Sequence, residues 1–441
     1  MRIIILTLLF SVITLSAVNA QPDDLHEMGV KGYALVLNMQ FEQANKIFNE
    51  MSRMEPENVL GHLLLALSYG WMWEINGSDE KLGEKYHDQL TRACDIAEEM
   101  LDKNEDDIDA LFFAGCAYGK LTRYYMQTGK WVRAYINGRT GTAYMKKVLD
   151  KDPEYYDAYL GIGMSHYYTK AISLYSTTIR LISGNTEGYR EKGIGEIFLA
   201  VSKGKYVSDE AKAILATSIL SWGFEEDWVA ALPLLIELTG KYPQNHFFKL
   251  QLAECYMNLN KPDPALQTIE QLMLSETLKK NKYLLNRLYY IRGRTYAKLN
   301  EFEKAVTAFK KALGVIQTKT LSLFYMGDAY EMMGEVDKAH ESYNKIEKSV
   351  GLLGYFYLGA KSRIENPYTP SQIEFYRGTN YLACGKYTQA AEIFYELLGI
   401  ELNKEKPDSA FIANLRFNIG RVEYEMEELR PKMEKARREM K

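Results

Sequence analysis

The chain has 441 residues, of which 47% are apolar and 25% are charged, and its formal net charge is −4. This composition is typical of a folded protein and excludes a largely disordered chain. Four cysteines are too few for a scaffold held together by disulfides, and the slightly acidic charge balance argues against a nucleic-acid binder, which usually has a basic surface.

The first twenty residues have the pattern of a secretory signal peptide. Arg2 is the only charged residue before a mostly apolar stretch, 3–15, and small residues precede a cleavage site after Ala20. The alternative is an uncleaved N-terminal anchor, but the apolar stretch is short for a membrane span of about 20 residues. We therefore expect cleavage near Ala20, export to the periplasm or out of a bacterial cell, and no transmembrane span in the mature chain.

Residues 21–245 are predicted to form an N-terminal series of helix pairs. A small residue, Gly32, is followed by Ala44 and Phe48 at a spacing that recurs further along the chain. Pro56 then closes the second helix of the pair, because proline lacks the backbone N–H that a helix interior requires.

The units that follow are stretched. We expect an insert at 71–89 that delays the second helix of its unit to 93–101. Further inserts are expected at 120–140 and 164–190, where the spacing between repeat positions is too long for a compact helix pair.

Two Gly-x-Gly sequences, 161–163 and 193–195, resemble fragments of a phosphate-binding loop. Neither follows a predicted strand, and both lie within a helical pattern. We therefore interpret them as places where helices pack closely.

Twelve of the 33 tyrosines lie between residues 118 and 189, and the segment 158–182 carries few charges. Tyrosine is favoured where one end of a side chain is buried and the other is wet, so this region could form an aromatic binding surface that includes Tyr167 and Tyr168. Packing within the core of long helices is the alternative. The same segment, 158–182, would be the site if the protein binds an apolar ligand or a membrane surface.

The cysteines do not form a metal-binding pattern. Cys94 and Cys116 lie on consecutive predicted helices and are the only candidate for a disulfide. Cys255 and Cys384 have no other cysteine near them in the sequence. We prefer the interpretation that all four are free thiols.

The range 246–400 contains the clearest internal repeat. In each unit a small residue is followed by a tyrosine, an alanine and an aromatic or aliphatic residue at constant spacing. These positions are Gly293, Tyr296, Ala305 and Phe309 in one unit and Gly327, Tyr330, Ala339 and Tyr343 in the next, 34 residues later. A small residue lets the two helices of a pair approach closely, and each pair buries its apolar stripe only when the next pair stacks on it.

A 34-residue period with this pattern resembles the tetratricopeptide repeat (TPR) family. The resemblance covers most of residues 25–400 and implies an all-α fold, a right-handed α-solenoid of antiparallel helix pairs with inserted or elongated helices in the middle. An extra helix is expected at 351–364. Residues 401–441, which are acidic first and basic later, are expected to form a capping helix.

The resemblance also implies a concave groove lined by the first helix of each pair. The groove positions form a basic strip beside an acidic one, with aromatic residues between them. The candidate partner-binding residues are Arg287, Tyr290, Arg294, Lys298, Phe324, Asp328 and Glu331, in addition to Tyr167 and Tyr168. The set lacks the Lys/Asn pattern with which chaperone-binding TPR proteins hold a peptide carboxylate. Ordinary solvated helix faces are the alternative interpretation.

No sequence motif indicates catalysis. The six histidines do not form H-E-x-x-H or a helical ligand pair, and there is no Walker A sequence. We expect no cofactor, no metal and no nucleic acid. The sequence therefore predicts a non-enzymatic, exported scaffold that binds a protein or peptide partner in its groove.

Overall fold

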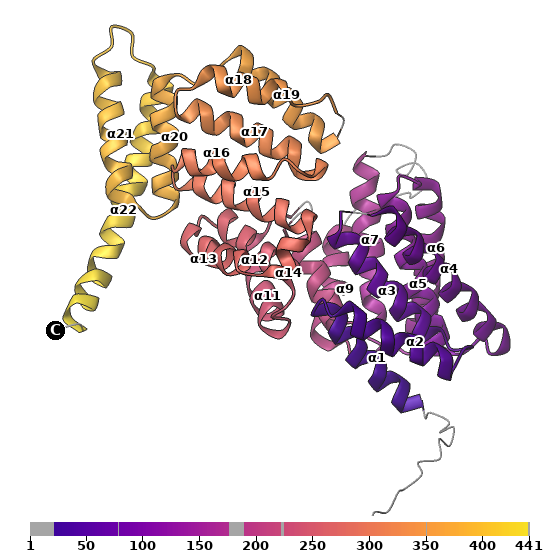
Figure 1. The fold of residues 1–441 in the computed structure, drawn as a ribbon. Helices are drawn as coiled ribbons and strands as arrows, with labels where there is room; N and C mark the ends of the chain where they lie inside the picture. Colours follow the sequence, from indigo (N-terminus) through magenta and orange to yellow (C-terminus); the bar gives the residue numbers. More distant parts are fainter. Residues whose placement is uncertain (1–21, 78, 176–188, 222–224, 350, 440–441) are drawn as a thin grey trace, which may run out of the picture.

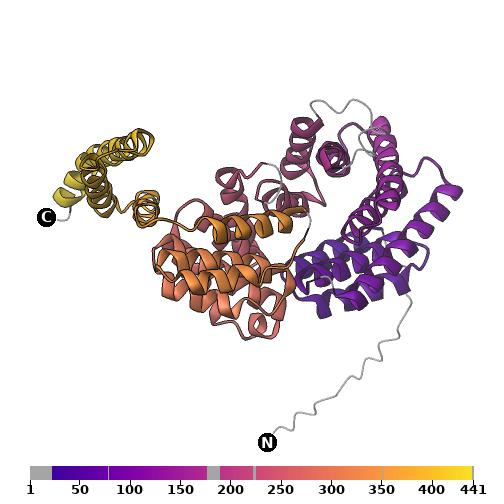
Figure 2. The ribbon, with the colours of Figure 1, turned by 90° about the horizontal axis from the view of Figure 1, so that it is seen from above.

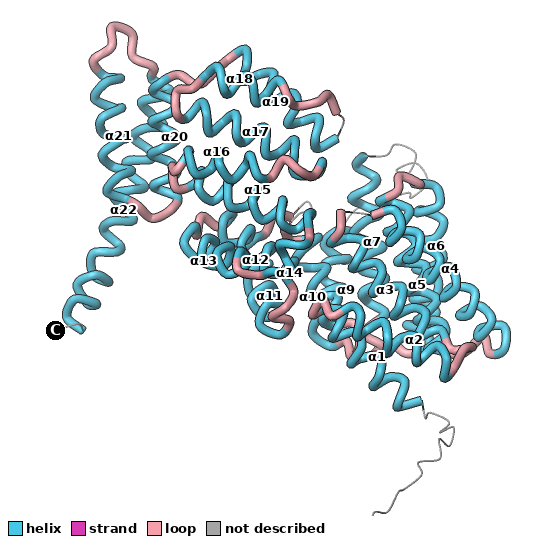
Figure 3. The backbone as a smooth tube through the Cα atoms, viewed as in Figure 1, coloured by secondary structure: helices cyan, strands magenta, loops and turns pink. Residues whose placement is uncertain are grey.

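A computed structural model describes residues 22–77, 79–175, 189–221, 225–349 and 351–439. The predicted signal peptide, 1–20, lies outside this part of the chain. Within it, all regular secondary structure is helical (Figure 3). The elements of the first half are α1 (Pro22–Leu37), α2 (Phe41–Met54), α3 (Val59–Ile75), α4 (Glu80–Lys103), α5 (Ile108–Gln127), α6 (Trp131–Lys151), α7 (Ala158–Tyr175), α9 (Tyr189–Lys203), α10 (Ser208–Ile214) and the π-helical turn η1 (Leu215–Ile219).

The second half continues in the same way. Its elements are α11 (Trp228–Lys241), α12 (His246–Asn258), α13 (Pro262–Met273), α14 (Glu276–Lys280), α15 (Lys282–Lys298), α16 (Phe302–Lys311), α17 (Ile316–Met332), α18 (Val336–Asn344), α19 (Gly351–Glu365), α20 (Pro370–Ala383), α21 (Tyr387–Leu402) and α22 (Ser409–Glu439). Helices that follow one another pack side by side along the chain (Figure 1). The predicted all-α solenoid of helix pairs is confirmed.

The small residues of the repeat permit this packing. A Cβ atom added to Gly293 would lie 2.5 Å from the ring of Phe309, and one added to Gly327 would collide with the ring of Tyr343. The aromatic residue of each second helix therefore lies directly against the glycine of the first, as the spacing predicts.

The predicted insert at 71–89 is wrong. α3 continues to Ile75, and α4 begins at Glu80 rather than near residue 93. Tyr86, Leu90 and Ala93 continue the buried stripe of α4 at helical spacing, so this unit consists of two long helices joined by a short turn.

In the region 120–140 the two helices of the unit are longer than expected, and no separate insert lies between them. α5 runs to Gln127, and α6 starts at Trp131. Of the predicted insert at 164–190, residues 176–188 lie outside the described part. By contrast, the predicted extra helix at 351–364 is confirmed as α19.

The N-terminal helices meet the middle of the chain. The Asn245 side-chain amide donates to the Leu37 carbonyl (2.6 Å), and that of Asn281 donates to the Ile75 carbonyl (3.0 Å). The indole of Trp71 packs edge-on against Phe248. The solenoid thus turns far enough for the ends of α1 and α3 to contact α12 and the start of α15, more than 200 residues later, and the first half forms a broad body beside the later repeats (Figure 2).

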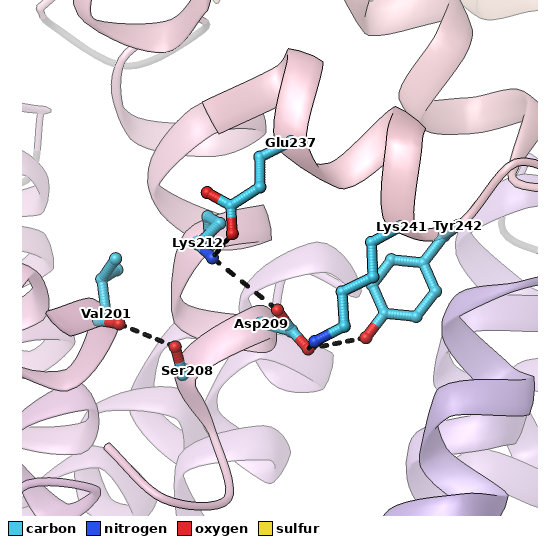
Figure 4. Close-up of polar contacts among 7 residues, drawn as sticks. All are labelled: Val201, Ser208, Asp209, Lys212, Glu237, Lys241 and Tyr242. Atoms are coloured by element: carbon cyan, nitrogen blue, oxygen red, sulfur yellow. Dashed lines mark hydrogen bonds and ion pairs between the residues drawn. The ribbon is translucent and has the colours of Figure 1, made fainter. Parts of the chain in front are cut away.

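α10 and η1 lie between α9 and α11 (Figure 3). They contain the longest uninterrupted run of buried residues in the described part of the chain, 210–217. The polar residues at its start bind the neighbouring helices. Asp209 accepts a hydrogen bond from the Tyr242 hydroxyl (2.6 Å) and pairs with Lys241, whereas Lys212 pairs with Glu237 (Figure 4). These contacts attach α10 to α11.

All four cysteines are free thiols, as preferred from the sequence, and the alternative Cys94–Cys116 disulfide is not formed. None of the described helices combines the length and the apolar character that crossing a membrane requires.

Candidate functional site

A pocket of about 350 Å³ opens between α5, α6 and α7. Val207, just before α10, and Glu210 and Ile214 within it form a further side. Most of the lining is apolar. The apolar side chains include Met126, Trp131, Ala134, Leu160, Met164 and Ile214.

Ion pairs hold the walls of the pocket together. Lys120 of α5 pairs with Glu210 of α10, and Arg123 pairs with Glu74 of α3 at 2.7 Å. Both cations are therefore neutralised by carboxylates of the chain itself. The Lys120–Glu210 pair is largely buried, and it attaches α10 to α5.

Asp157, another lining residue, positions the turn that precedes α10. Its buried carboxylate accepts hydrogen bonds from the backbone N–H groups of Lys205 (3.0 Å), Tyr206 (2.8 Å) and Val207 (2.8 Å). This one side chain connects the start of α7 to the turn between α9 and α10, and through that turn it sets where Val207 and Glu210 face the pocket.

The pocket lies within the tyrosine-rich region. Tyr168 lines it, whereas the neighbouring Tyr167 is 1% exposed and belongs to the core, where its ring packs edge-on against that of Tyr168. Of the two tyrosines proposed from the sequence, Tyr168 is therefore the one placed where a ligand can reach it.

The predicted basic residues of the C-terminal groove lie on α15, and their contacts are mainly with partners in the same chain. Arg287 pairs with Glu254 at 2.9 Å. Arg294 donates to the Tyr290 hydroxyl at 2.9 Å, and its guanidinium lies 4.2 Å from the centre of the Tyr325 ring.

Lys298 donates to the Asn260 side chain at 2.6 Å. Burial, with a contribution from the nearby charge of Arg294, lowers the pKa of the Lys298 ammonium group. Phe324 is half-buried and packs against Phe356 of α19.

The residues of the predicted acidic strip lie deeper in the fold than those of the basic strip. Asp328 accepts a hydrogen bond from the Tyr343 hydroxyl at 2.7 Å. Glu331 is 1% exposed, and within the described part of the chain neither of its carboxylate oxygens has a hydrogen bond of good geometry. Burial raises the pKa of Asp328 to about 6 and that of Glu331 to about 7.

The Glu331→Gln variant is expected to become more stable relative to the wild type as the pH rises. An unfolded glutamate titrates near 4.3, whereas folded Glu331 keeps its proton to about pH 7. Between these values only the unfolded state releases the proton of Glu331, so this group lowers the stability of the wild type as the pH rises, and the glutamine variant lacks that contribution. At pH 5 the two should be similar, and at pH 8 the variant should be more stable by up to about 3 kcal/mol in urea unfolding.

Glu341 provides the control for this experiment. It is exposed and pairs with Lys345 at 2.7 Å, so Glu341→Gln should gain nothing at pH 8. A difference between Glu331→Gln and the wild type that is the same at pH 5 and pH 8 would contradict the assignment.

Among the described residues, no group of three or more His, Cys, Asp or Glu side chains is arranged to hold a metal ion. Sequence reasoning missed the pocket because its lining comes from separate segments between Gly115 and Ile214. The only signals were the tyrosine cluster and the glycine pair 161–163, one member of which, Gly161, lines the pocket.

Three family models described as tetratricopeptide repeat match the chain at residues 225–278, 287–318 and 321–349. Residues 225–349 of the chain therefore contain tetratricopeptide repeats. The matches coincide with α11 to α18, where the small residues and their aromatic partners lie in contact.

Solved structures resemble the chain only loosely. A TPR protein from Parabacteroides merdae is 16% identical over 69% of this chain and 98% of its own, with a TM-score of 0.31. A human IFIT1 dimer with PPP-AAAA is 14% identical over 86% of this chain and 95% of its own, with a TM-score of 0.42. No curated protein sequence matches the chain.

Proposed function

We propose that this TPR protein is a non-enzymatic, exported scaffold that holds a protein partner on its concave surface. The observation that carries the proposal is the run of TPR units over residues 225–349, because stacked helical repeats create extended concave surfaces that serve for binding. TPR folds typically act as scaffolds rather than as catalysts.

The C-terminal groove offers contact groups for such a partner. Arg294 and Lys298 lie on the same face of α15, and Phe324 follows on α17; all three are partly exposed. Arginine and aromatic side chains are the residues that most often dominate the energetics of protein interfaces. The chain's own aromatic contacts hold the Arg294 guanidinium in place, which reduces the entropy that a partner must remove on binding.

Crosslinking followed by affinity capture from an envelope extract tests this proposal. The double variant Arg294→Glu with Lys298→Glu should lose the partner that the wild type retains. Lys304→Glu with Lys310→Glu, on the exposed face of α16, makes the same change of charge outside the groove and should keep it. If both double variants retain every partner, the groove is not the binding surface.

Export rests on the signal-peptide pattern of residues 1–20. N-terminal sequencing of the protein from its native host should find a chain that begins near Gln21. Membrane-surface association of the segment 158–182 stays a prediction, since the side chains of 170–182 lie outside the described residues. Flotation with liposomes tests it.

A further inference from the structure

We propose that the pocket between α5, α6 and α7 binds a small molecule with an apolar chain and one anionic group, the chemistry of a fatty acid. This goes beyond the scaffold function, which concerns the C-terminal groove, because the pocket belongs to other helices and would take a small ligand rather than a protein.

The size and lining of the pocket favour such a ligand. About 350 Å³ falls within the range of pockets that bind small molecules, roughly 300–1,000 Å³. Met126, Leu160, Met164 and Ile214 supply an apolar surface, and flexible methionine side chains adapt to the shape of a chain. Transfer of the methylene groups of a ligand from water to such a lining favours binding.

Glycines leave part of the wall open. Gly115, Gly141 and Gly161 are explained by packing, since a Cβ atom at each would lie about 3 Å from Met145 or from the backbone of α5. Gly119 is different, because a Cβ atom there would meet nothing within 4 Å. Gly119 lines the pocket, so the free space in front of its backbone is space that a ligand can occupy.

The charges of the lining favour an anion at the mouth. Lys120 and Arg123 already pair with Glu210 and Glu74. Arg139 also lines the pocket, but it is exposed, and within the described ranges it forms no ion pair with any carboxylate. A ligand whose carboxylate contacts Arg139 would gain a charge-assisted hydrogen bond while its chain enters the apolar part.

Binding of the fluorescent fatty acid cis-parinarate to the full mature chain tests the proposal. We expect saturable binding with one site per chain. Dodecanoate should displace the probe, whereas dodecyltrimethylammonium, which has the same chain and the opposite charge, should displace it poorly. Arg139→Glu should weaken binding by about tenfold, the effect of losing one such contact.

A plug variant separates the pocket from other apolar surfaces. Gly119→Leu places a side chain in the pocket from a position where its Cβ atom meets no protein atom within 4 Å, and it should reduce probe binding by at least about tenfold. The control is Gly195→Leu on α9, an exposed helical glycine that also has nothing within 4 Å and is absent from the pocket lining; it should bind like the wild type. Circular dichroism and thermal unfolding check that both variants fold.

The proposal is overturned if the wild type shows no saturable binding, if Gly119→Leu binds as well as Gly195→Leu, or if the ammonium compound competes as well as dodecanoate. Each of these results is independent of partner capture by the C-terminal groove. Failure of the pocket and failure of the scaffold can therefore be distinguished.

Discussion

Replacing Gly193 by alanine is expected to destabilise the fold by about 3 kcal/mol, at the upper end of the range for overpacked positions. A Cβ atom at Gly193 would lie 2.6 Å from the carbonyl oxygen of Gly163 and 2.7 Å from the backbone nitrogen of Tyr167. Both are backbone atoms of α7, so no side-chain rotation can relieve the contact and α9 must move away from α7. The gain in helix propensity from glycine to alanine, up to about 1 kcal/mol, does not offset this.

Gly195→Ala is the matched control, since it makes the same substitution two residues away in the same helix. Its Cβ atom would meet nothing within 4 Å, so we expect unchanged or slightly increased stability. Urea unfolding followed by circular dichroism measures both variants. Equal stabilities for Gly193→Ala and Gly195→Ala would show that α7 and α9 are not packed backbone to backbone.

Replacing Asp157 by alanine is expected to have the second large effect, a loss of at least about 2 kcal/mol in the free energy of unfolding. The substitution removes the acceptor of three consecutive backbone N–H groups, from Lys205 to Val207. Leaving a buried donor unsatisfied costs about 1–3 kcal/mol; Tyr206 and Val207 are partly buried, whereas Lys205 is exposed and its N–H can bind water. The stability of Asp157→Asn should lie between that of Asp157→Ala and that of the wild type. One side-chain oxygen can still accept hydrogen bonds from Tyr206 and Val207, while the amide group faces the N–H of Lys205.

Asp227 is the matched control for this experiment. Its exposed side chain accepts one backbone hydrogen bond, from Ala230 at 2.9 Å, as the N-cap of α11. Asp227→Ala should therefore cost only about 1 kcal/mol. Hydrogen exchange of the amides of residues 205–207 should accelerate in Asp157→Ala and not in Asp227→Ala. A loss of stability in Asp157→Ala no larger than in Asp227→Ala would mean that the turn is held by other contacts.

The Asp157 result also bears on the pocket. The turn that Asp157 binds leads directly into α10, which carries Glu210 and Ile214 on one side of the pocket. If the turn loosens, that side loses its fixed position, and binding of the fatty-acid probe should weaken in Asp157→Ala even where the rest of the chain stays folded.

Local patterns predicted the repeats well and the inserts poorly. The contact of Gly293 with Phe309 follows from spacing, because residues at helical intervals share a face and a glycine admits the partner helix. The insert at 71–89 was wrong because a long helix differs from a short helix plus a loop only in whether its polar face is interrupted. Tyr86 and Leu90 extend the buried stripe of α4 where no interruption exists.

The segment α10–η1 shows a different limit. Ala211, Ala213 and Ala216 are small and apolar on several sides of the helix, a pattern that indicates burial but not what covers it. Similarly, Arg287 and Glu331 were placed on a helix face by their positions in the repeat. Whether such a face is exposed to water depends on neighbours from other units. Arg287 proved to be paired with Glu254, and Glu331 proved to be buried.

The sequence by itself determined the helical class, the repeat and the close packing of its glycines, because these depend on periodicity within one helix or between adjacent helices. Only the tertiary structure decided the contact of α1 and α3 with α12 and α15, the burial of α10 and the pocket. Each of these joins residues that lie far apart in the chain, so the burial and charge state of one segment are set by another that no local pattern identifies.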